Sequence, residues 1–183
     1  MIHLAGLSRP MIEHNINIKR SIDLNIIGTA NITKACSDLK IKLVYFSTNY
    51  VYPGVKGNYN EKDPVLPINN YAWSKLGGEA SVQLYKNSLI LRVSMTEKPF
   101  IHDKAFVNVK TSFMFHDDVS SILFKVIDKK GIINIGGKSQ FIYDFAKKNN
   151  PNVKKIYLNK NLKNIMPKDS SINISKLKKI LKK

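Results

Sequence analysis

The amino-acid sequence predicts an α/β protein whose parallel sheet carries helices on both faces. Short apolar runs rich in β-branched and aromatic residues alternate along the chain with segments whose apolar residues recur at helical spacing. That alternation is typical of parallel strands joined by crossover helices. The length of 183 residues, of which 43% are hydrophobic, is enough for roughly one domain with a buried core.

The first half of the chain contains two predicted strands, a long helix and a loop. Residues 1–4 and 41–46 are apolar runs of strand length. Apolar residues recur at helical spacing over 12–39. Gly28 inside that helix costs about 1 kcal/mol relative to Ala, which indicates close packing or a local kink. Prolines and glycines then predict an ordered loop over 53–70.

The second half repeats this alternation with shorter elements. A helix is expected over 71–84, a buried strand over 88–93, and an irregular segment with several aromatic residues over 94–112. Acidic residues at the start of 117–128 predict a capped helix. A strand over about 132–136 is stopped by a pair of glycines, and two short lysine-rich helices follow it.

The chain is strongly basic, but its basic residues match nucleic-acid binding poorly. The formal net charge is +17, and only three of the 30 basic residues are arginines. Nucleic-acid sites favour arginine forks and aromatic stacking platforms instead. We therefore expect no nucleic-acid binding, and a solvated lysine-rich surface that attracts an anionic small ligand.

Simple counts exclude several other classes of protein. Cys36 is the only cysteine, which excludes an internal disulfide framework and a multi-cysteine metal site. The four histidines lack metal-ligand spacing, and we expect no metal site. No apolar run approaches the ~18 residues that a membrane span needs, and the N-terminus lacks the pattern of a secretory signal. A cytoplasmic location follows as the expectation.

Unusual residues gather where predicted strands end. The three clusters are Ala5-Gly6, Ser47-Thr48-Asn49 and Arg92-Val93-Ser94. Ligands of parallel α/β sheets bind outside the carboxyl ends of the strands. The sequence therefore predicts one site that all three clusters share.

Tyr71 and Lys75 bring chemistry to this site. They are four residues apart on a predicted helix and therefore lie on one face. An ammonium group beside a phenol favours the phenolate, which predicts a lowered pKa for Tyr71. Such a tyrosine can act as a general acid or base on an alcohol or ketone oxygen, with the Thr48 hydroxyl on the same oxygen. The group suits carbonyl reduction with a nicotinamide cofactor that carries the hydride.

In this context the chain resembles the extended short-chain dehydrogenase/reductase superfamily (NAD-dependent epimerase/dehydratase proteins), and within it the dTDP-4-dehydrorhamnose reductases and their relatives. The motifs that carry the resemblance occur in order along nearly the whole chain. They occupy residues 2–5, 25–29, 43–54, 59–64, 71–79, 91–94, 117–119, 131–137 and 167–171. The resemblance implies a Rossmann-like fold and a nucleotide-sugar substrate.

The resemblance also implies a role for each site residue. Tyr71 would donate a proton to the 4-keto oxygen of the sugar, Thr48 would share that oxygen, and Lys75 would tune Tyr71. The implied cofactor-binding residues, for NADP or NAD, are Ala5, Gly6, Leu7, Tyr71 and Lys75. The implied substrate-binding residues are Thr48, Asn49 and Met95. Asn49 stands where the reductases usually have Asp, and Met95 stands where they often have Trp.

Two further features of the resemblance concern helices. Asn25 would support the helix that carries the proton relay. The helix that starts near Tyr71 often pairs across a two-fold axis in this superfamily, which implies a homodimer. Trp73 on that helix is then either a dimer anchor or a core residue.

The front of the chain departs from the family pattern. The glycine-rich turn Gly-x-x-Gly-x-x-Gly, which cradles the cofactor pyrophosphate, does not occur in this sequence. The first strand matches the fourth strand of the family, so we expect a truncated Rossmann-like sheet that lacks about 55–65 residues. Residues 1–95 would be the C-terminal portion of the NAD(P)-binding domain. Residues 96–183 would be a small substrate-binding part with one strand, at about 132–136, and lysine-rich helices.

Three functions remain open at this stage. The first is an NAD(P)-dependent reductase of a nucleotide-linked 4-keto-6-deoxy sugar. The second is a nucleotide-sugar 4-epimerase, which would hold its cofactor through turnover. The third is a non-catalytic binding or regulatory relative, or a fragment, because the glycine-rich turn is absent and cofactor affinity should then be weak.

Overall fold

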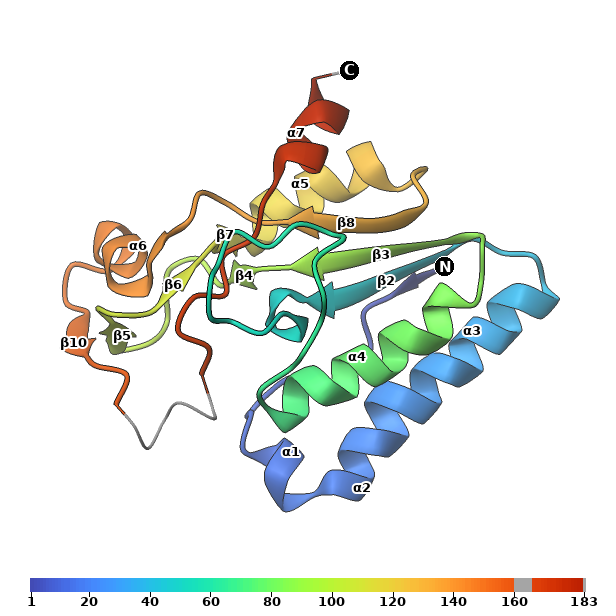
Figure 1. Cartoon of the computed structure of the whole chain (residues 1–183), viewed down its shortest axis with the longest axis horizontal. Helices are drawn as coiled ribbons and strands as arrows, with labels where there is room; N and C mark the ends of the chain where they lie inside the picture. Colours follow the sequence, from blue (N-terminus) through green and yellow to red (C-terminus); the bar gives the residue numbers. More distant parts are fainter. Residues whose placement is uncertain (160–165, 183) are drawn as a thin grey trace.

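The computed structural model describes residues 1–159 and 166–182, and its centre is a parallel sheet (Figure 1). Four strands lie in the order β1-β2-β3-β8, and every neighbouring pair is parallel. The strands are β1 (Ile2–His3), β2 (Leu43–Thr48), β3 (Ser88–Val93) and β8 (Gly131–Ile135). The predicted α/β class with a parallel sheet is confirmed.

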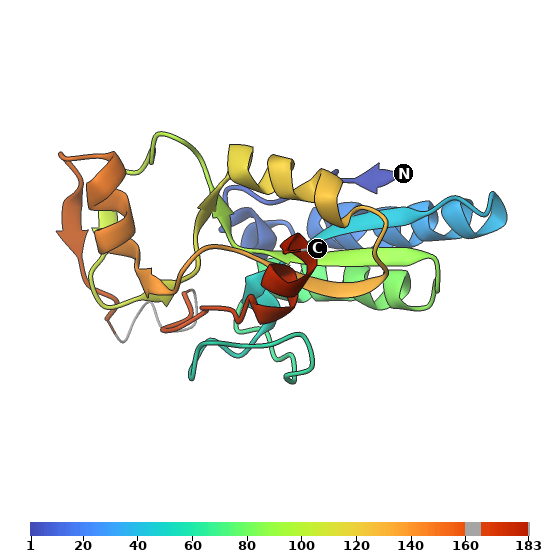
Figure 2. The same cartoon turned by 90° about the horizontal axis from the view of Figure 1, so that it is seen from above.

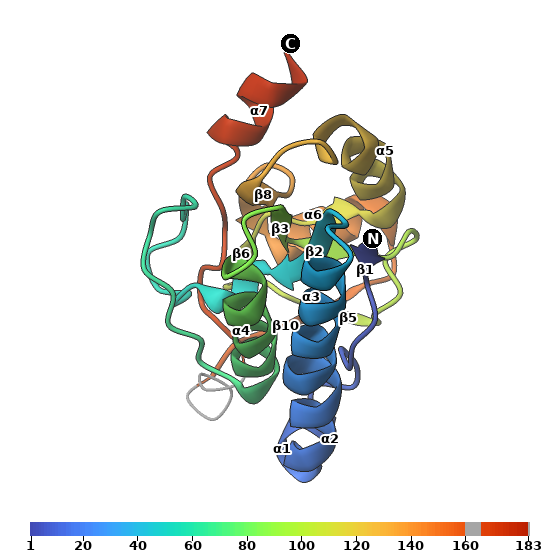
Figure 3. The same ribbon diagram turned by 90° about the vertical axis from the view of Figure 1, so that its right-hand side faces the viewer.

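Alternation along β2 explains why both faces of the sheet carry helices. Leu43 and Tyr45 belong to one buried apolar cluster, and Val44 and Phe46 belong to another. Because successive side chains of a strand point to opposite faces, a strand that is apolar throughout needs cover on both. The helices α3 (Gly28–Asp38) and α4 (Asn70–Gln83) cover one face, as Figure 3 shows. The helices α5 (His116–Val126) and α7 (Ser175–Leu181) cover the other.

The long helix expected over 12–39 is divided into four segments. It comprises α1 (Glu13–Ile16), α2 (Ile18–Ser21), a π-helical segment η1 (Ile22–Ile27) and α3. The Gly28 amide donates to the Asp23 carbonyl, and a Cβ at Gly28 would lie 3.2 Å from that oxygen. The glycine predicted to mark close packing or a kink therefore lies where the π-helical segment returns to α-helix.

The other elements also lie near their predicted positions. The helix expected over 71–84 is α4, and the strand expected over 88–93 is β3. The helix expected over 117–128 is α5, which begins one residue earlier: Phe115 takes the N-cap position, and the two aspartates lie in the first turn. The expectation of an acidic cap was therefore wrong.

A second lobe lies beyond the carboxyl ends of the strands (Figure 2). It holds the paired strands β5 (Lys104–Phe106) and β10 (Lys154–Ile156), and β6 (Lys110–Thr111) and β9 (Gln140–Phe141). The helix α6 (Ile142–Asn149) packs on them through Phe145 and Ala146. The strands β4 (Met95–Thr96) and β7 (Met114–Phe115) connect this lobe to the sheet.

The lobe differs from the small second part that the sequence predicts. The strand expected there at about 132–136 is β8, which lies in the central sheet beside β3. The lobe instead has short strands of its own: β5 and β6 lie in the segment that looked irregular in sequence, and β9 and β10 lie in the part where lysine-rich helices were expected. Such two- and three-residue strands have too few residues to display a periodicity. Residues 160–165 and 183 of the predicted second part lie outside the described residues.

Across residues 1–159 and 166–182, no helix is both long enough and apolar enough to cross a membrane.

Candidate functional site

A cavity of about 1120 Å³ lies between the carboxyl ends of the sheet strands and the second lobe. Its lining includes the strand-end residues Ser47, Thr48, Asn49 and Val93, and Tyr71 of α4. The second lobe contributes an aromatic wall. That wall is Phe100, Phe106 and Phe113. The place predicted for a site, at the carboxyl ends of parallel strands, therefore does contain a cavity.

Thr48 and Tyr71 meet at this cavity. Thr48 is the last residue of β2 and is buried, and Tyr71 is the second residue of α4. The helix starts here because the Asn69 side chain accepts a hydrogen bond from the Ala72 amide at 2.9 Å. Both side chains line the cavity, and Thr48 is near enough to Tyr71 to lower the pKa of its phenol. Two hydroxyl groups from different elements can therefore contact one oxygen of a ligand.

The pKa of Tyr71 is raised, and the predicted lowering by Lys75 was wrong. Burial of the phenol raises the pKa, while the Thr48 hydrogen bond and the positive charge of Arg9 lower it by less. Desolvation disfavours the phenolate more strongly than these two groups favour it. At neutral pH the phenol is therefore protonated, which suits a proton donor.

Lys75 lies outside the lining of this cavity, within the part of the chain that the structure describes. Its Nζ atom is 4.3 Å from the centre of the Tyr45 ring, and its positive charge lowers the pKa of His3. The ammonium group therefore faces the first two strands of the sheet. Burial lowers the pKa of Lys75 to about 8, although the nearby Glu79 carboxylate opposes the shift.

The lowered pKa of Lys75 can be measured directly. In a ¹³C NMR titration of the lysine side chains, we expect one signal with a midpoint near pH 8 that is absent from Lys75→Met. The unfolded chain keeps this proton up to about pH 10.5 and the folded chain only to about 8, so stability should rise as pH increases between these values. A signal that disappears in Lys75→Met but titrates near 10.5 would contradict this placement.

Asn25 fixes the loop that follows β1. Its Oδ1 accepts from the Leu7 amide at 2.7 Å, and its Nδ2 donates to the Leu7 carbonyl at 2.8 Å. The same Nδ2 donates to Ser74 Oγ of α4 at 2.8 Å. A Cβ at Gly6 would lie 2.8 Å from Asn25 Oδ1, so this approach requires a glycine. Asn25 thus joins the loop containing Ala5, Gly6 and Leu7 to the helix of Tyr71 and Lys75.

Asn49 lines the cavity, but its amide group is already used. Its Nδ2 donates to the Ser170 carbonyl at 2.9 Å and lies 3.4 Å from Thr111 Oγ1. Asn49 therefore holds the segment before α7 against the strand end. The predicted contact between Asn49 and substrate remains a proposal, whereas this structural contact is formed within the chain. Met95, the other predicted substrate residue, also lines the cavity and is partly exposed.

Asn49→Asp should destabilise the protein, although the resemblance described above implies Asp at this position. A buried carboxylate would replace the amide donor and face the Ser170 carbonyl, at a cost on the order of 1–3 kcal/mol. Urea unfolding at neutral pH measures this loss. Asn31→Asp, on the exposed side of α3, is the control and should change stability by less than about 0.5 kcal/mol. Equal stabilities of the two variants would contradict the role given to Asn49.

The expectation that all three strand-end clusters share one site holds only in part. Ser47-Thr48-Asn49 and Val93 line the cavity, whereas Ala5-Gly6 and Arg92 are outside its described lining.

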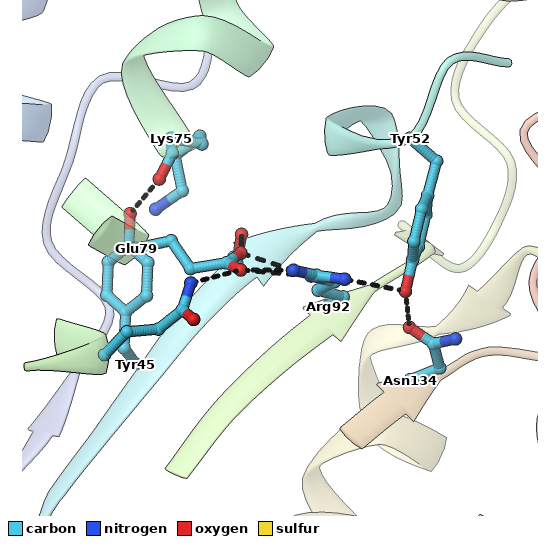
Figure 4. Close-up of polar contacts among 8 residues, drawn as sticks. Tyr45, Tyr52, Lys75, Glu79, Arg92 and Asn134 are labelled. Carbon is cyan, nitrogen blue, oxygen red and sulfur yellow. Dashed lines mark hydrogen bonds and ion pairs between the residues drawn. The ribbon is translucent and has the colours of Figure 1, made fainter. Parts of the chain in front are cut away.

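The Arg92 side chain is 3% exposed, and its Nη2 contacts Glu79 Oε1 at 2.5 Å. On its other side, Arg92 Nη1 donates to the Tyr52 hydroxyl at 2.9 Å. That hydroxyl in turn donates to Asn134 Oδ1 (Figure 4). Ser47 Oγ also donates to Glu79, at 2.7 Å. This buried network joins α4 to β2, β3 and β8.

Sequence reasoning missed the charged residues of the described cavity lining, which are Arg9, Glu97, Asp103 and Lys104. Arg9, in the loop after β1, and Glu97, just after β4, both line it and form an ion pair. Arg9 stands two residues after the loop already singled out, and that proximity was the available signal. Glu97 lies in the segment that looked irregular, where nothing marked it. Among the described residues, no group of three His, Cys, Asp or Glu could hold a metal ion.

Comparisons with known proteins agree with this fold. The structure of a hypothetical dTDP-4-dehydrorhamnose reductase from Sulfolobus tokodaii matches with a TM-score of 0.87 at 27% identity, over 98% of this chain and 72% of that one. The NADP complex of dTDP-4-dehydrorhamnose reductase from Bacillus anthracis matches with a TM-score of 0.82 at 24% identity, over 97% and 72%.

A curated relative of another kind also matches. The beta subunit of methionine adenosyltransferase 2 from Pongo abelii is 33% identical over 82 residues, which are 45% of this chain and 24% of the relative. The match thus spans about a quarter of the length of that relative.

A family model decides between a general α/β likeness and a defined family. The model described as the RmlD substrate binding domain matches residues 13–128. These residues include η1, β2, α4, β3 and α5, and with them Thr48, Tyr71 and Lys75. The resemblance that the sequence motifs indicated is confirmed, and the chain belongs to the RmlD substrate-binding domain family.

Proposed function

We propose that the chain reduces a nucleotide-linked 4-keto-6-deoxy sugar with NADPH or NADH, and that Tyr71 is the proton donor. The observation that carries the proposal is that Thr48 and Tyr71, from two different elements, line the same cavity at the carboxyl ends of the strands. Thr48 holds the keto oxygen, and Tyr71 transfers its phenolic proton to that oxygen as the carbonyl becomes an alcohol. The raised pKa of Tyr71 keeps this proton in place until it is needed.

The residues that would hold the nicotinamide end of the cofactor lie beside the first two strands, outside the described lining of the cavity. The amine of Lys75 and the loop of Ala5, Gly6 and Leu7 both lie at the first two strands, and Asn25 fixes the loop. An amine donor beside a fixed, glycine-containing loop fits ribose hydroxyls. When bound, the cofactor would supply the hydride that adds to the sugar carbon. Lys75 would bind the ribose, and Tyr71 would complete the reduction with a proton.

The second lobe completes the proposal as the part that binds the nucleotide end of the substrate. Its aromatic side chains form one wall of the cavity, opposite Thr48 and Tyr71. Aromatic rings offer stacking surfaces to a base. We therefore keep the division that the sequence indicated: residues 1–95 would bind the cofactor, and residues 96–183 would bind the substrate.

A direct assay tests the reductase. The chain is incubated with NADPH and a dTDP-4-keto-6-deoxy sugar, and NADPH is followed by absorbance and the sugar by chromatography. Consumption of NADPH with formation of the 4-hydroxy sugar supports the proposal. Interconversion of 4-epimers without net consumption would identify the epimerase instead, and an unchanged sugar at every enzyme concentration would contradict both.

The likeness to the beta subunit of methionine adenosyltransferase 2 favours a second candidate, a regulatory subunit of another enzyme. The test is co-elution of the chain with a methionine adenosyltransferase catalytic subunit, followed by an assay of that enzyme. Changed kinetics of the partner, unaffected by Tyr71→Phe, would support the regulatory function. Failure to co-elute at micromolar concentrations would count against it.

We also propose that two copies associate through α4. Trp73 is 48% exposed, and it borders a mainly apolar groove of about 530 Å³ together with Ile18 and Ile22. Trp73→Glu should leave a monomer in sedimentation experiments, because it places a charge in that interface. Leu84→Glu, at the far end of the helix and 86% exposed, is the matched control and should not alter association. A wild-type monomer at all concentrations would overturn the proposal.

A further inference from the structure

An ion pair joins the two sides of the cavity. Arg9 lies in the loop after β1, and Glu97 follows β4, 88 residues later. Arg9 Nη1 donates to Glu97 Oε1, and Arg9 Nη2 donates to Glu97 Oε2 at 3.1 Å. Both nitrogens of the guanidinium fork therefore contact both oxygens of one carboxylate. Phosphate groups have the same spacing of oxygens and accept the same two parallel hydrogen bonds.

The pair lies beside the proposed reaction centre. Arg9, Glu97 and Tyr71 all line the cavity, and the Arg9 charge lowers the pKa of Tyr71 and of Tyr50. Among the described lining residues, the other permanently charged cation is Lys104, which belongs to β5 of the second lobe. Arg9 is therefore the cation on the same side of the cavity as Tyr71.

Exposure makes this contact exchangeable. The Arg9 side chain is 51% exposed, and that of Glu97 is 27% exposed. Ion pairs with this much solvent contact contribute little to the free energy of folding, because water stabilises both charges when they are apart. A ligand oxyanion that also gains other contacts in the cavity can therefore replace Glu97. A second pair, Arg20 with Glu13, has similar exposures of 57% and 23% but lies outside the described cavity lining.

We propose that Arg9 binds a phosphate group of the ligand, and that Glu97 occupies this position as an internal substitute until the ligand displaces it. The inference rests on the proposed function for the kind of ligand, a molecule with a diphosphate. That diphosphate belongs either to the nucleotide sugar or to the dinucleotide cofactor. Arg9 then raises the affinity for the ligand because it binds the phosphate. Glu97 lowers the affinity because it competes with that phosphate for Arg9.

Calorimetric titrations with inorganic pyrophosphate, dTDP and NADPH test this opposition. Glu97→Gln should tighten binding about 2–5-fold, because it releases Arg9 from competition. Arg9→Gln should weaken binding about 10-fold, because it removes a charge-assisted contact. In the double variant, affinity should equal that of Arg9→Gln within about 2-fold, since no guanidinium is then left to release. Glu13→Gln, in the matched pair, should leave all three affinities unchanged.

The source of the phosphate follows from the arms of the titration. An effect of Glu97→Gln on dTDP but not on NADPH assigns Arg9 to the nucleotide sugar, and the reverse assigns it to the cofactor. Arg9→Lys keeps the positive charge but loses the two parallel hydrogen bonds of the guanidinium, so it should give an intermediate affinity. It replaces Arg9→Gln in the test if that variant does not fold. The inference is overturned if Glu97→Gln weakens binding or leaves it unchanged, or if wild type binds none of the three.

These outcomes are distinct from those of the reductase assay. Opposite effects of Glu97→Gln and Arg9→Gln on binding, without turnover of NADPH, would uphold the phosphate site and reject the reductase. Turnover of NADPH without opposite effects of the two variants on binding would uphold the reductase and reject the phosphate site.

Discussion

Replacing Tyr71 by Phe is expected to lower kcat for reduction of the keto sugar by about 10²–10⁴-fold, the usual contribution of a positioned general acid. The substitution removes the phenolic hydroxyl, whose pKa Thr48 affects, but keeps the ring. That ring packs against His14 with its centre 5.3 Å away, so stability should change little. Steady-state kinetics with NADPH, with unfolding curves for both proteins, measures the two effects.

Tyr50→Phe is the matched control for this prediction. Tyr50 lines the same cavity, and its ring centre is 6.5 Å from that of Tyr71, but its hydroxyl donates to the Met166 sulfur. Loss of this hydroxyl should change kcat by only a few-fold, since weak contacts to sulfur contribute little. If Tyr71→Phe keeps a kcat near that of wild type, Tyr71 is not the proton donor.

Glu79→Ala is expected to destabilise the fold by about 3–5 kcal/mol, the largest change of stability that we predict. Glu79 is fully buried and is the counter-charge of Arg92, which is itself 3% exposed. Without Glu79 the guanidinium remains buried with an unbalanced charge, and Ser47 loses its acceptor. Urea unfolding followed by circular dichroism measures the loss.

The double variant Glu79→Leu with Arg92→Met separates charge from volume. Because it removes both charges and fills their space, it should be more stable than Glu79→Ala. A double variant no more stable than Glu79→Ala would show that the network matters for its hydrogen bonds to Tyr52 and Ser47 rather than for charge balance.

The sheet could be predicted because its signal is local. β2 and β3 are apolar throughout, and their polar ends could be placed at one edge of the sheet from the rule for parallel strands. Thr48 and Tyr71 followed from that rule and from the resemblance. The directions of long side chains could not be predicted. Lys75 extends toward Tyr45, and Arg92 extends inward to Glu79, because each found a partner that is distant in sequence.

The second lobe was harder for the same reason. Each of its strands has two or three residues, and their pairing joins segments such as 104–106 and 154–156. The Arg9–Glu97 pair likewise joins two segments that are 88 residues apart in sequence. Contacts between short, separated pieces leave no periodicity in sequence, so the charged residues of the cavity could be found only in three dimensions.

The π-helical segment η1 carries one consequence for sequence change. Its wider turn holds one residue more than an α-helical turn would, and each residue of an α-helix advances by about 100° around the axis. Deleting one residue within 22–27 would therefore rotate the helix before it against the helix after it. Either Asn25 would lose Leu7, or Cys36 and Thr33 would turn out of their buried positions. The length of this segment is therefore constrained separately from the identity of its residues.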